Sequence, residues 1–190
     1  MDHTNTHDNA PKRSSVVVWD PFVRLFHWSL VLSVFTAWWT GDDYKSLHLA
    51  SGYVAGGLIV ARLLWGFFGP RYARFSQFVR GPGVVVGYLK AMMRGQVPRY
   101  LGHNPAGGAM IVALLTILSG VGFTGWLLTT DAFWGTVTME RIHETLVDIV
   151  LALVCVHVLG VIVMSTKHGE NLVRSMLTGR KRRPNSGDVA

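Results

Sequence analysis

Cysteine and charge are both scarce in this sequence. Cys155 is the only cysteine among 190 residues, which excludes a disulfide framework, a four-thiolate zinc site and a thiolate-held iron–sulfur cluster built by this chain alone. Charged residues make up 15% of the chain, against roughly 25% in ordinary globular proteins, while apolar residues make up 49%. This composition excludes disorder over most of the chain. An integral membrane protein and an apolar soluble bundle stay open.

The distribution of charge decides between these two classes. Four stretches are almost free of charge, namely residues 22–40, 47–69, 106–130 and 144–166. Each has about the 20 residues that a helix needs to cross the hydrocarbon layer, and a helix is expected because lipid offers no partner to backbone polar groups. Helices of soluble bundles carry a charged face, which these stretches lack. We therefore predict an all-α integral membrane protein built as a bundle of four spanning helices.

Basic residues lie almost entirely on one side of the predicted bundle. Fourteen of them precede the first span, separate the second from the third or follow the fourth, whereas only Lys45 and Arg141 lie on the other side. An even number of spans puts both termini on one side, and the positive-inside rule makes that side the cytoplasm. The net charge of +7 is then a topological signal that also contacts lipid headgroups, so we expect no nucleic-acid partner.

The segments outside the spans are short. Residues 83–94 cannot cross a bilayer, and their mixture of apolar and basic residues predicts an interfacial amphipathic helix between the second and third spans. The polar residues 1–15 and 183–190 predict disordered tails on either side of a single domain of residues 16–182.

Four histidines lie within the predicted spans or at their ends, where an ionisable residue is costly and indicates function. They are His27, His48, His143 and His157. His143 and His157 are 14 residues apart, which corresponds to about 1400° of rotation, roughly 40° short of four full turns, and to a rise of about 21 Å. They therefore share one helix face at two depths. The directions of the spans bring His48 to the depth of His143, near the outer surface, and His27 to the depth of His157, near the inner surface.

Paired imidazoles from different helices, without a carboxylate, are typical of a haem iron with two axial histidines. Zinc would need four ligands, usually including thiolate or carboxylate. The chain has no C-x-x-C-H motif, so the two predicted haems would be b-type and bound without a covalent link. Two other interpretations remain open. One is a non-redox membrane anchor or assembly subunit of a respiratory complex, and the other is a metal transporter, for which the third span offers little polar path.

Two arginines and one further histidine accompany the predicted haem ligands. Arg24 lies about one turn before His27, and Arg62 lies 14 residues after His48 on the same face. Either guanidinium could pair with haem propionates, which need cationic partners, or could reach the interface by snorkelling. His103 precedes the third span and is left over once the pairs are made. Arg62 and His103 together motivate the hypothesis of a quinone pocket near the inner surface. His103 could instead contact a haem propionate or be an ordinary residue of an interfacial loop.

Five segments carry a resemblance to a known family. They are VWDPFVRLFHW (18–28), LHLASGY (47–53), PRYLGHNPAGG (98–108), RIHE (141–144) and HGENLVRSMLTGRKR (168–182). Taken together they resemble the bacterial cytochrome b-561 and nickel–iron hydrogenase b-type cytochrome family. The resemblance implies a four-helix protein of the bacterial cytoplasmic membrane with two b haems, ligated from the first, second and fourth helices. Carried over by position, the ligands are His27, His48, His143 and His157.

The resemblance also implies a function. Members of the family exchange electrons between the quinone pool, as ubiquinone or menaquinone, and a partner such as a hydrogenase subunit or a soluble c-type cytochrome. The chain has no hydrogenase-type cysteine cluster, so a catalytic subunit of that kind would be a separate protein. We therefore interpret the chain as a transmembrane electron-transfer cytochrome b. The sequence leaves open whether it acts as a quinol or quinone oxidoreductase and whether it forms a homodimer.

Overall fold

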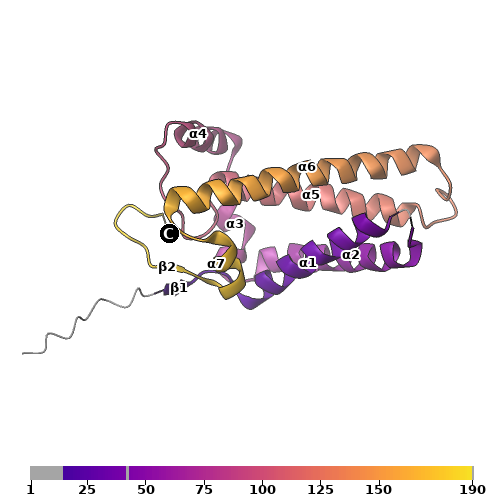
Figure 1. Cartoon of the computed structure of the whole chain (residues 1–190), viewed down its shortest axis with the longest axis horizontal. Coiled ribbons are helices and arrows are strands. Elements are labelled where there is room, and N and C mark those ends of the chain that lie inside the picture. The colour runs from indigo at the N-terminus through magenta and orange to yellow at the C-terminus, as the bar shows by residue number, and fades with distance from the viewer. Residues whose placement is uncertain (1–14, 42, 190) are drawn as a thin grey trace, which may run out of the picture.

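Four long helices run along a common axis in the computed structural model, which describes residues 15–41 and 43–189 (Figure 1). They are α1 (Pro21–Thr40), α2 (Lys45–Phe68), α5 (Pro105–Leu127) and α6 (Val137–His168). α1 packs against α2, α5 packs against α6, and α2 also contacts α5. The predicted helices are therefore present, with α6 starting about two turns before the expected residue 144. The predicted tail of residues 1–15 lies outside the described residues except for Ser15.

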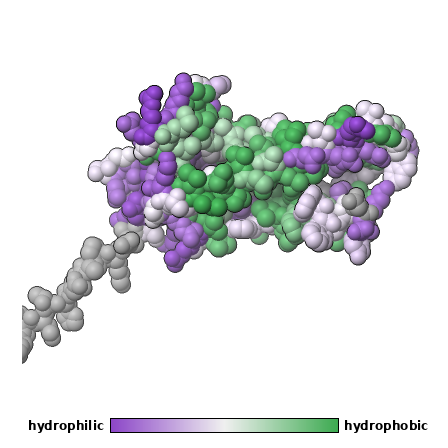
Figure 2. Space-filling model, turned by 45° about the horizontal axis from the view of Figure 1, so that its top comes forward, coloured by the Kyte–Doolittle hydropathy of each residue, from purple (hydrophilic) through white to green (hydrophobic). Residues whose placement is uncertain are grey.

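Three of these helices, α2, α5 and α6, are long and apolar enough to cross a bilayer. α1 has 20 residues, but Arg24, His27 and three tryptophans lower its mean hydropathy. Figure 2 shows a largely apolar middle between more hydrophilic ends, and α1 contributes exposed side chains such as Leu32 and Phe35 to the apolar surface of the molecule. This distribution is that of an all-α membrane protein, in which α1 joins the three apolar helices by packing on α2.

The helices begin and end where the sequence supplies suitable groups. Asp20 caps α1 by accepting a hydrogen bond from the backbone N–H of Val23 at 3.1 Å, and a proline occupies the first turn. Asn104 caps α5 in the same way by accepting from the N–H of Gly107 at 2.7 Å, again followed by proline. Both arrangements satisfy backbone donors that a helix leaves free. α6 ends at Gly169, whose φ of 58° is readily adopted by glycine.

Short elements gather at one end of the bundle (Figure 1). We call these elements together the cap, and this end of the bundle the capped end. They are β1 (Ser15–Val17), the 3-10 helix η1 (Arg71–Ala73), α3 (Phe75–Phe78), α4 (Pro82–Met93), α7 (Leu172–Thr178) and β2 (Arg180–Arg182). α4 confirms the helix predicted at residues 83–94. β1 and β2 form a small antiparallel sheet that the sequence pattern does not predict. The opposite end, where α1 joins α2 and α5 joins α6, is named the loop end.

The close approach of α3 to α2 depends on a glycine. A side-chain carbon added at Gly66 would lie 2.1 Å from the ring of Phe75, so only glycine allows this contact. Phe78, at the end of α3, is 1% exposed and anchors the cap in the bundle. On the other side of the cap, Trp19 donates a hydrogen bond from Nε1 to Ser175 Oγ of α7 at 3.3 Å. The cap is therefore packed onto the helices through aromatic side chains.

The end of the chain differs from the disordered tail expected at residues 183–190. Asp188 accepts a hydrogen bond from Arg99 at 2.6 Å, and the backbone of Val189 bonds to Arg99 O and to the N–H of Leu101. Arg99 is 5% exposed and also pairs with Glu170 at 2.9 Å. An ion cluster that joins segments this far apart in the sequence cannot be inferred from local composition. The ordered chain therefore extends beyond residue 182.

The Arg99 ion cluster predicts acid sensitivity of the cap. Burial alone would raise the pKa of Glu170, but hydrogen bonds from Arg99 and from the N–H of Arg182 outweigh it and lower the pKa below 4.5. The stabilisation is therefore complete above the pKa of an unfolded glutamate and is lost as the pH falls through the lowered pKa. Glu170→Gln should lower the free energy of unfolding of the cap by about 2 kcal/mol at pH 7.

Thermal melting of the detergent-solubilised protein, followed by tryptophan fluorescence, measures this effect. The melting temperature of the wild type should fall towards that of Glu170→Gln as the pH is lowered from 7 to 3. Glu144→Gln, which changes an exposed carboxylate at the loop end, serves as the matched control and should melt like the wild type. Equal melting temperatures of Glu170→Gln and the wild type at pH 7 would contradict the prediction.

Candidate functional site

The structure brings the four histidines of the predicted spans together in two pairs. His27 of α1 faces His157 of α6, with ring centroids 6.5 Å apart, and His48 of α2 faces His143 of α6, with ring centroids 6.3 Å apart. The first pair lies towards the capped end and the second towards the loop end. These are the partners expected from spacing and depth, and α6 contributes one residue to each pair.

The separation of the rings fits a metal ion between them. An imidazole–metal bond of about 2 Å on each side, added to the distance from each nitrogen to its ring centre, separates the centres by roughly 6 Å. A direct hydrogen bond between two ring nitrogens would bring the centres to about 5 Å. The measured separations of 6.5 and 6.3 Å match the first arrangement. The spacing of each pair therefore fits a metal ion that both imidazoles would hold.

Hydrogen bonds orient both rings of the loop-end pair. His48 Nδ1 donates to the carbonyl of Ala37 at 2.8 Å, and His143 Nδ1 lies 3.0 Å from Thr124 Oγ1. Thr124 donates its own proton to Gly120 O at 2.9 Å, so its oxygen accepts from His143. A histidine that donates from Nδ1 keeps Nε2 unprotonated and available to a metal. The loop-end pair thus has the supporting contacts typical of metal-bound histidines.

Glycines leave room beside this pair. A side-chain carbon added at Gly125 of α5 would lie 3.1 Å from the His143 ring, tighter than an ordinary contact. Gly52 and Gly56 follow His48 by one and two turns on the same face of α2. A side-chain carbon at either of them would meet no described atom within 4 Å. A flat group bound at His48 therefore finds space along this strip of α2.

An apolar layer separates the two pairs. Ile59, Leu118 and Val150 form a buried cluster contributed by α2, α5 and α6. Val150 lies midway along α6 between His143 and His157, whose positions are about 21 Å apart. Two redox centres at the pairs would therefore be separated by packed side chains of low polarity.

Arg62 and Arg24 lie at the capped end and make different contacts. Arg62 is 3% exposed and so does not snorkel to the surface. Its Nη2 donates to Ala73 O at 3.0 Å, while its Nη1 is buried without a partner among the described residues. Arg24 donates from Nη2 to Leu177 O. Arg24 therefore links α1 to α7, whereas Arg62 keeps one guanidinium nitrogen available inside the bundle.

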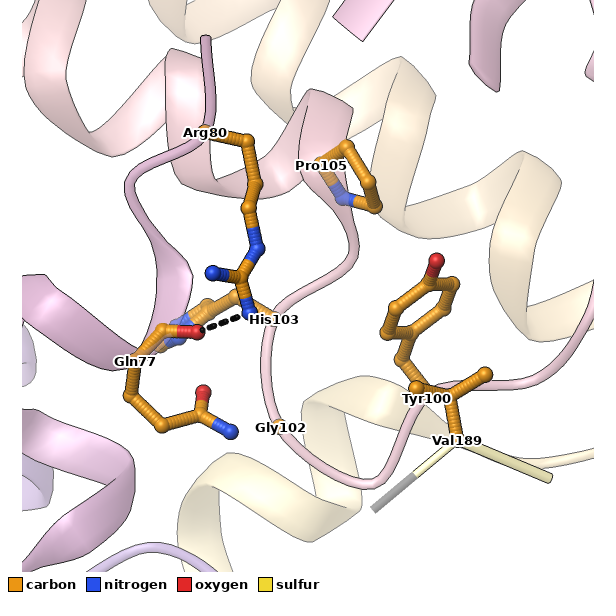
Figure 3. Close-up of a pocket in the computed structure, with 7 residues that line it drawn as sticks. All are labelled: Gln77, Arg80, Tyr100, Gly102, His103, Pro105 and Val189. Atoms are coloured by element: carbon orange, nitrogen blue, oxygen red, sulfur yellow. Dashed lines mark hydrogen bonds between the residues drawn. The ribbon is translucent and has the colours of Figure 1, made fainter. Parts of the chain in front are cut away.

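His103 packs between Trp19 and Phe78, with ring centroids 4.6 and 4.9 Å from theirs. Burial, aided by the charges of Lys181 and Arg62, lowers the pKa of His103 to about 3, so the ring is neutral at pH 7. It borders a cavity of about 30 Å³ (Figure 3). This volume admits one or two water molecules. This cavity is therefore too small for the quinone that the sequence places near Arg62 and His103.

Two contacts of the site escape sequence reasoning. Thr124 and the carbonyl of Ala37 hold the loop-end histidines, but a threonine in an apolar span ordinarily bonds to its own helix and a backbone carbonyl leaves no trace in the sequence. The described part of the chain also holds no group of three or more His, Cys, Asp or Glu side chains that could bind a metal ion. A zinc site built from such a group is therefore not found there.

Comparison with known proteins identifies the family of the chain. The family described as prokaryotic cytochrome b561 matches residues 18–179. The chain belongs to this family. Two curated relatives, each 21% identical, are named probable Ni/Fe-hydrogenase B-type cytochrome subunit. The one from Rhodobacter capsulatus aligns over 92% of this chain and 84% of its own length, and the one from Rhizobium leguminosarum bv. viciae over 92% of both. No solved structure matches the chain.

The resemblance stated from the sequence motifs is thereby confirmed. Membership of a b-type cytochrome family implies haem b as the cofactor and membrane electron transfer as the activity. The chemistry of the donor set agrees, because each pair offers imidazole nitrogens from two helices at a spacing that fits a metal ion.

Thr124→Val tests the support of the loop-end pair. Valine keeps the volume of threonine but cannot accept the hydrogen bond from His143, and losing such a supporting contact lowers metal-site affinity by about 10- to 100-fold. We expect the variant to lose haem during detergent exchange, measured by visible absorption of the reduced protein. Thr145→Val is the control, because within the described part of the chain the Thr145 hydroxyl bonds to Arg141 O of its own helix and not to a histidine. Equal haem retention by the two variants would show that Thr124 does not support the site.

Proposed function

We propose that the chain crosses the bacterial cytoplasmic membrane four times and passes electrons between two b haems. The observation that carries the proposal is the presence of two facing histidine pairs at two depths of one bundle. His48 and His143 would hold the haem near the outer surface, and His27 and His157 the haem near the inner surface. The length of α1 and its packing on α2 support a fourth crossing. The asymmetry of basic residues supports cytoplasmic termini.

The residues of the chain would have separate tasks. Haem supplies reversible one-electron chemistry at its iron. The imidazoles would fix the position of each centre, and the hydrogen bonds that His48 and His143 donate to Ala37 O and Thr124 Oγ1 keep the loop-end rings turned towards each other. The cluster around Val150 excludes water between the centres. Arg62 Nη1 is available to neutralise a haem propionate.

The names of the relatives support a hydrogenase as the redox partner. A soluble c-type cytochrome is the second candidate. With one cysteine, the chain cannot itself hold a thiolate-bound iron–sulfur cluster that would relay electrons. The catalytic subunit would therefore be a separate protein that docks on this one.

For the quinone we propose the groove between α6 and α7. It has a volume of about 360 Å³ and is lined by residues that include Val161, Ile162, Ser165, Thr166, Asn171 and Val173. Val161 lies about one turn from His157 towards the capped end. The apolar wall suits an isoprenoid tail, and the hydroxyl and amide groups could donate hydrogen bonds to quinone carbonyls. The groove is thus next to the proposed inner haem.

His157→Ala tests the two-haem assignment. Removing one axial ligand should abolish the inner haem and leave the outer one, so the haem-to-protein ratio should fall by half in a pyridine haemochrome assay. His143→Ala should remove the outer haem instead, and His168→Ala, outside both pairs, should change nothing. An unchanged haem-to-protein ratio in His157→Ala would contradict the assignment of His157 as a haem ligand. Purified wild-type protein without haem would favour the alternative of a non-redox anchor or assembly subunit.

Reoxidation of the reduced protein tests the quinone groove. A quinone takes up two electrons and two protons to become quinol, and two ferrous haems supply one electron each. Short-chain ubiquinone or menaquinone should therefore reoxidise the wild type. Ile162→Trp should fill the groove and slow reoxidation by about tenfold, or 1.4 kcal/mol. Ile149→Trp changes an exposed isoleucine in the other half of α6 and should leave the rate unchanged. Equal rates in both variants would exclude the groove.

A further inference from the structure

Buried nitrogens without a partner are concentrated at the capped end. In the described residues they are Arg24 Nε, His27 Nδ1, Arg62 Nη1, Trp65 Nε1 and His103 Nδ1. An unsatisfied buried polar group costs about 1–3 kcal/mol. In contrast, the loop-end histidines use their Nδ1 atoms in hydrogen bonds. The concentration of unpaired groups indicates that the capped end is built to bond to the acceptors of a bound molecule.

Arg62 lies at a depth that a molecule bound between His27 and His157 would reach. The rings of Phe22 and Trp65 pack with centroids 4.6 Å apart, and this contact between α1 and α2 serves as a common reference for depth. His27 is about 7.5 Å deeper along α1 than Phe22, and Arg62 is about 4.5 Å deeper along α2 than Trp65. The Arg62 backbone is therefore only about 3 Å from the level of His27, on the side of the capped end.

A row of aromatic rings leads from Arg62 to His103. The guanidinium of Arg62 lies 5.3 Å from the ring centroid of Phe75, which lies 5.7 Å from that of Phe78. Phe78 in turn packs on His103, whose other neighbour is Trp19. The positive charge of Arg62 is close enough to contribute to the lowered pKa of His103. The cationic nitrogen and the unpaired imidazole therefore belong to one region of the interior.

These two groups complement a carboxylate. A neutral imidazole offers one N–H donor, a guanidinium offers several, and a carboxylate accepts about four hydrogen bonds through two oxygens. A guanidinium buried as deeply as that of Arg62 also needs compensating negative charge. Asp20 is close enough to supply part of it, but forms no ion pair with Arg62 that would satisfy Nη1 among the described residues. An anion with oxygen acceptors that enters from the level of His27 satisfies both requirements.

We propose that Arg62 and His103 bind one propionate carboxylate of the inner haem, with Arg62 as the cation and His103 as a second hydrogen-bond donor. The inference rests on the proposed function. It gives a binding role to His103, which spacing and depth leave unassigned. It also assigns a function to the cap, because Trp19 and Phe78 pack on both sides of the His103 imidazole and hold it in place.

The test uses the purified full chain in detergent and compares His103→Phe with His103→Asn. Phenylalanine keeps the aromatic packing but removes the N–H, whereas asparagine keeps a polar amide near the position of Nδ1. The readouts are the haem-to-protein ratio and the two midpoint potentials from a redox titration. A propionate that loses a donor is more negative in effect and favours the ferric state. His103→Phe and Arg62→Gln should therefore shift the inner haem to a lower potential and release part of it.

The outer haem should keep its potential in every variant, His103→Asn should restore the inner one, and His168→Phe should behave as the wild type. His103→Phe and Arg62→Gln with two haems and unchanged potentials would overturn the inference and leave the proposed function standing. A potential that shifts with added inorganic phosphate in the wild type, but not in His103→Phe, would mean that a free anion occupies the pocket and would also overturn it. Wild-type protein without haem would contradict the proposed function itself.

Discussion

A polar imidazole inside an apolar bundle needs a partner. The helices are arranged so that two such pairs of imidazoles form, His27 with His157 and His48 with His143. α6 carries His143 and His157 on one face, about 21 Å apart along its axis. The hairpin of α1 and α2 has to present one histidine at each of these depths. It does so with His27 near the start of α1 and His48 near the start of α2. Because the two helices run in opposite directions, two residues near helix starts lie at opposite ends of the bundle.

The two pairs differ in what holds them. At the loop end, Ala37 and Thr124 fix the rings from outside, so the protein alone sets their orientation. At the capped end, His27 Nδ1, Arg62 Nη1 and His103 Nδ1 have no such partners in the described residues. The orientation of groups there depends more on what binds between them. Such asymmetry gives two sites of one bundle different surroundings, and the surroundings of a haem set its potential.

The cap connects this difference to the ends of the chain. The sheet of β1 and β2 joins residues 15–17 to residues 180–182, and the Arg99 ion cluster joins the loop before α5 to Glu170 and Asp188. Since these contacts close the bundle on the side of Arg62 and His103, they keep water from the buried nitrogens. A buried ion pair taken as a whole contributes little net stability, although removing one partner is costly because it leaves the other charge buried and unpaired. Its importance here is that it fixes the loop that carries His103.

The four long helices, the short helix α4 and the facing of the histidines in pairs could all be predicted from the sequence. Low charge over about 20 residues determines a span, and the rotation of 100° per residue determines which histidines share a face. The sheet, the ordered residues near Val189 and the bond from His143 to Thr124 could not be predicted. They join residues distant in the chain through short-range contacts, which leave no periodic pattern in the sequence. The sequence alone thus determined which residues are available for the site and at what depth, whereas only the tertiary structure decided their orientation, because a hydrogen bond depends on distances that helix packing sets.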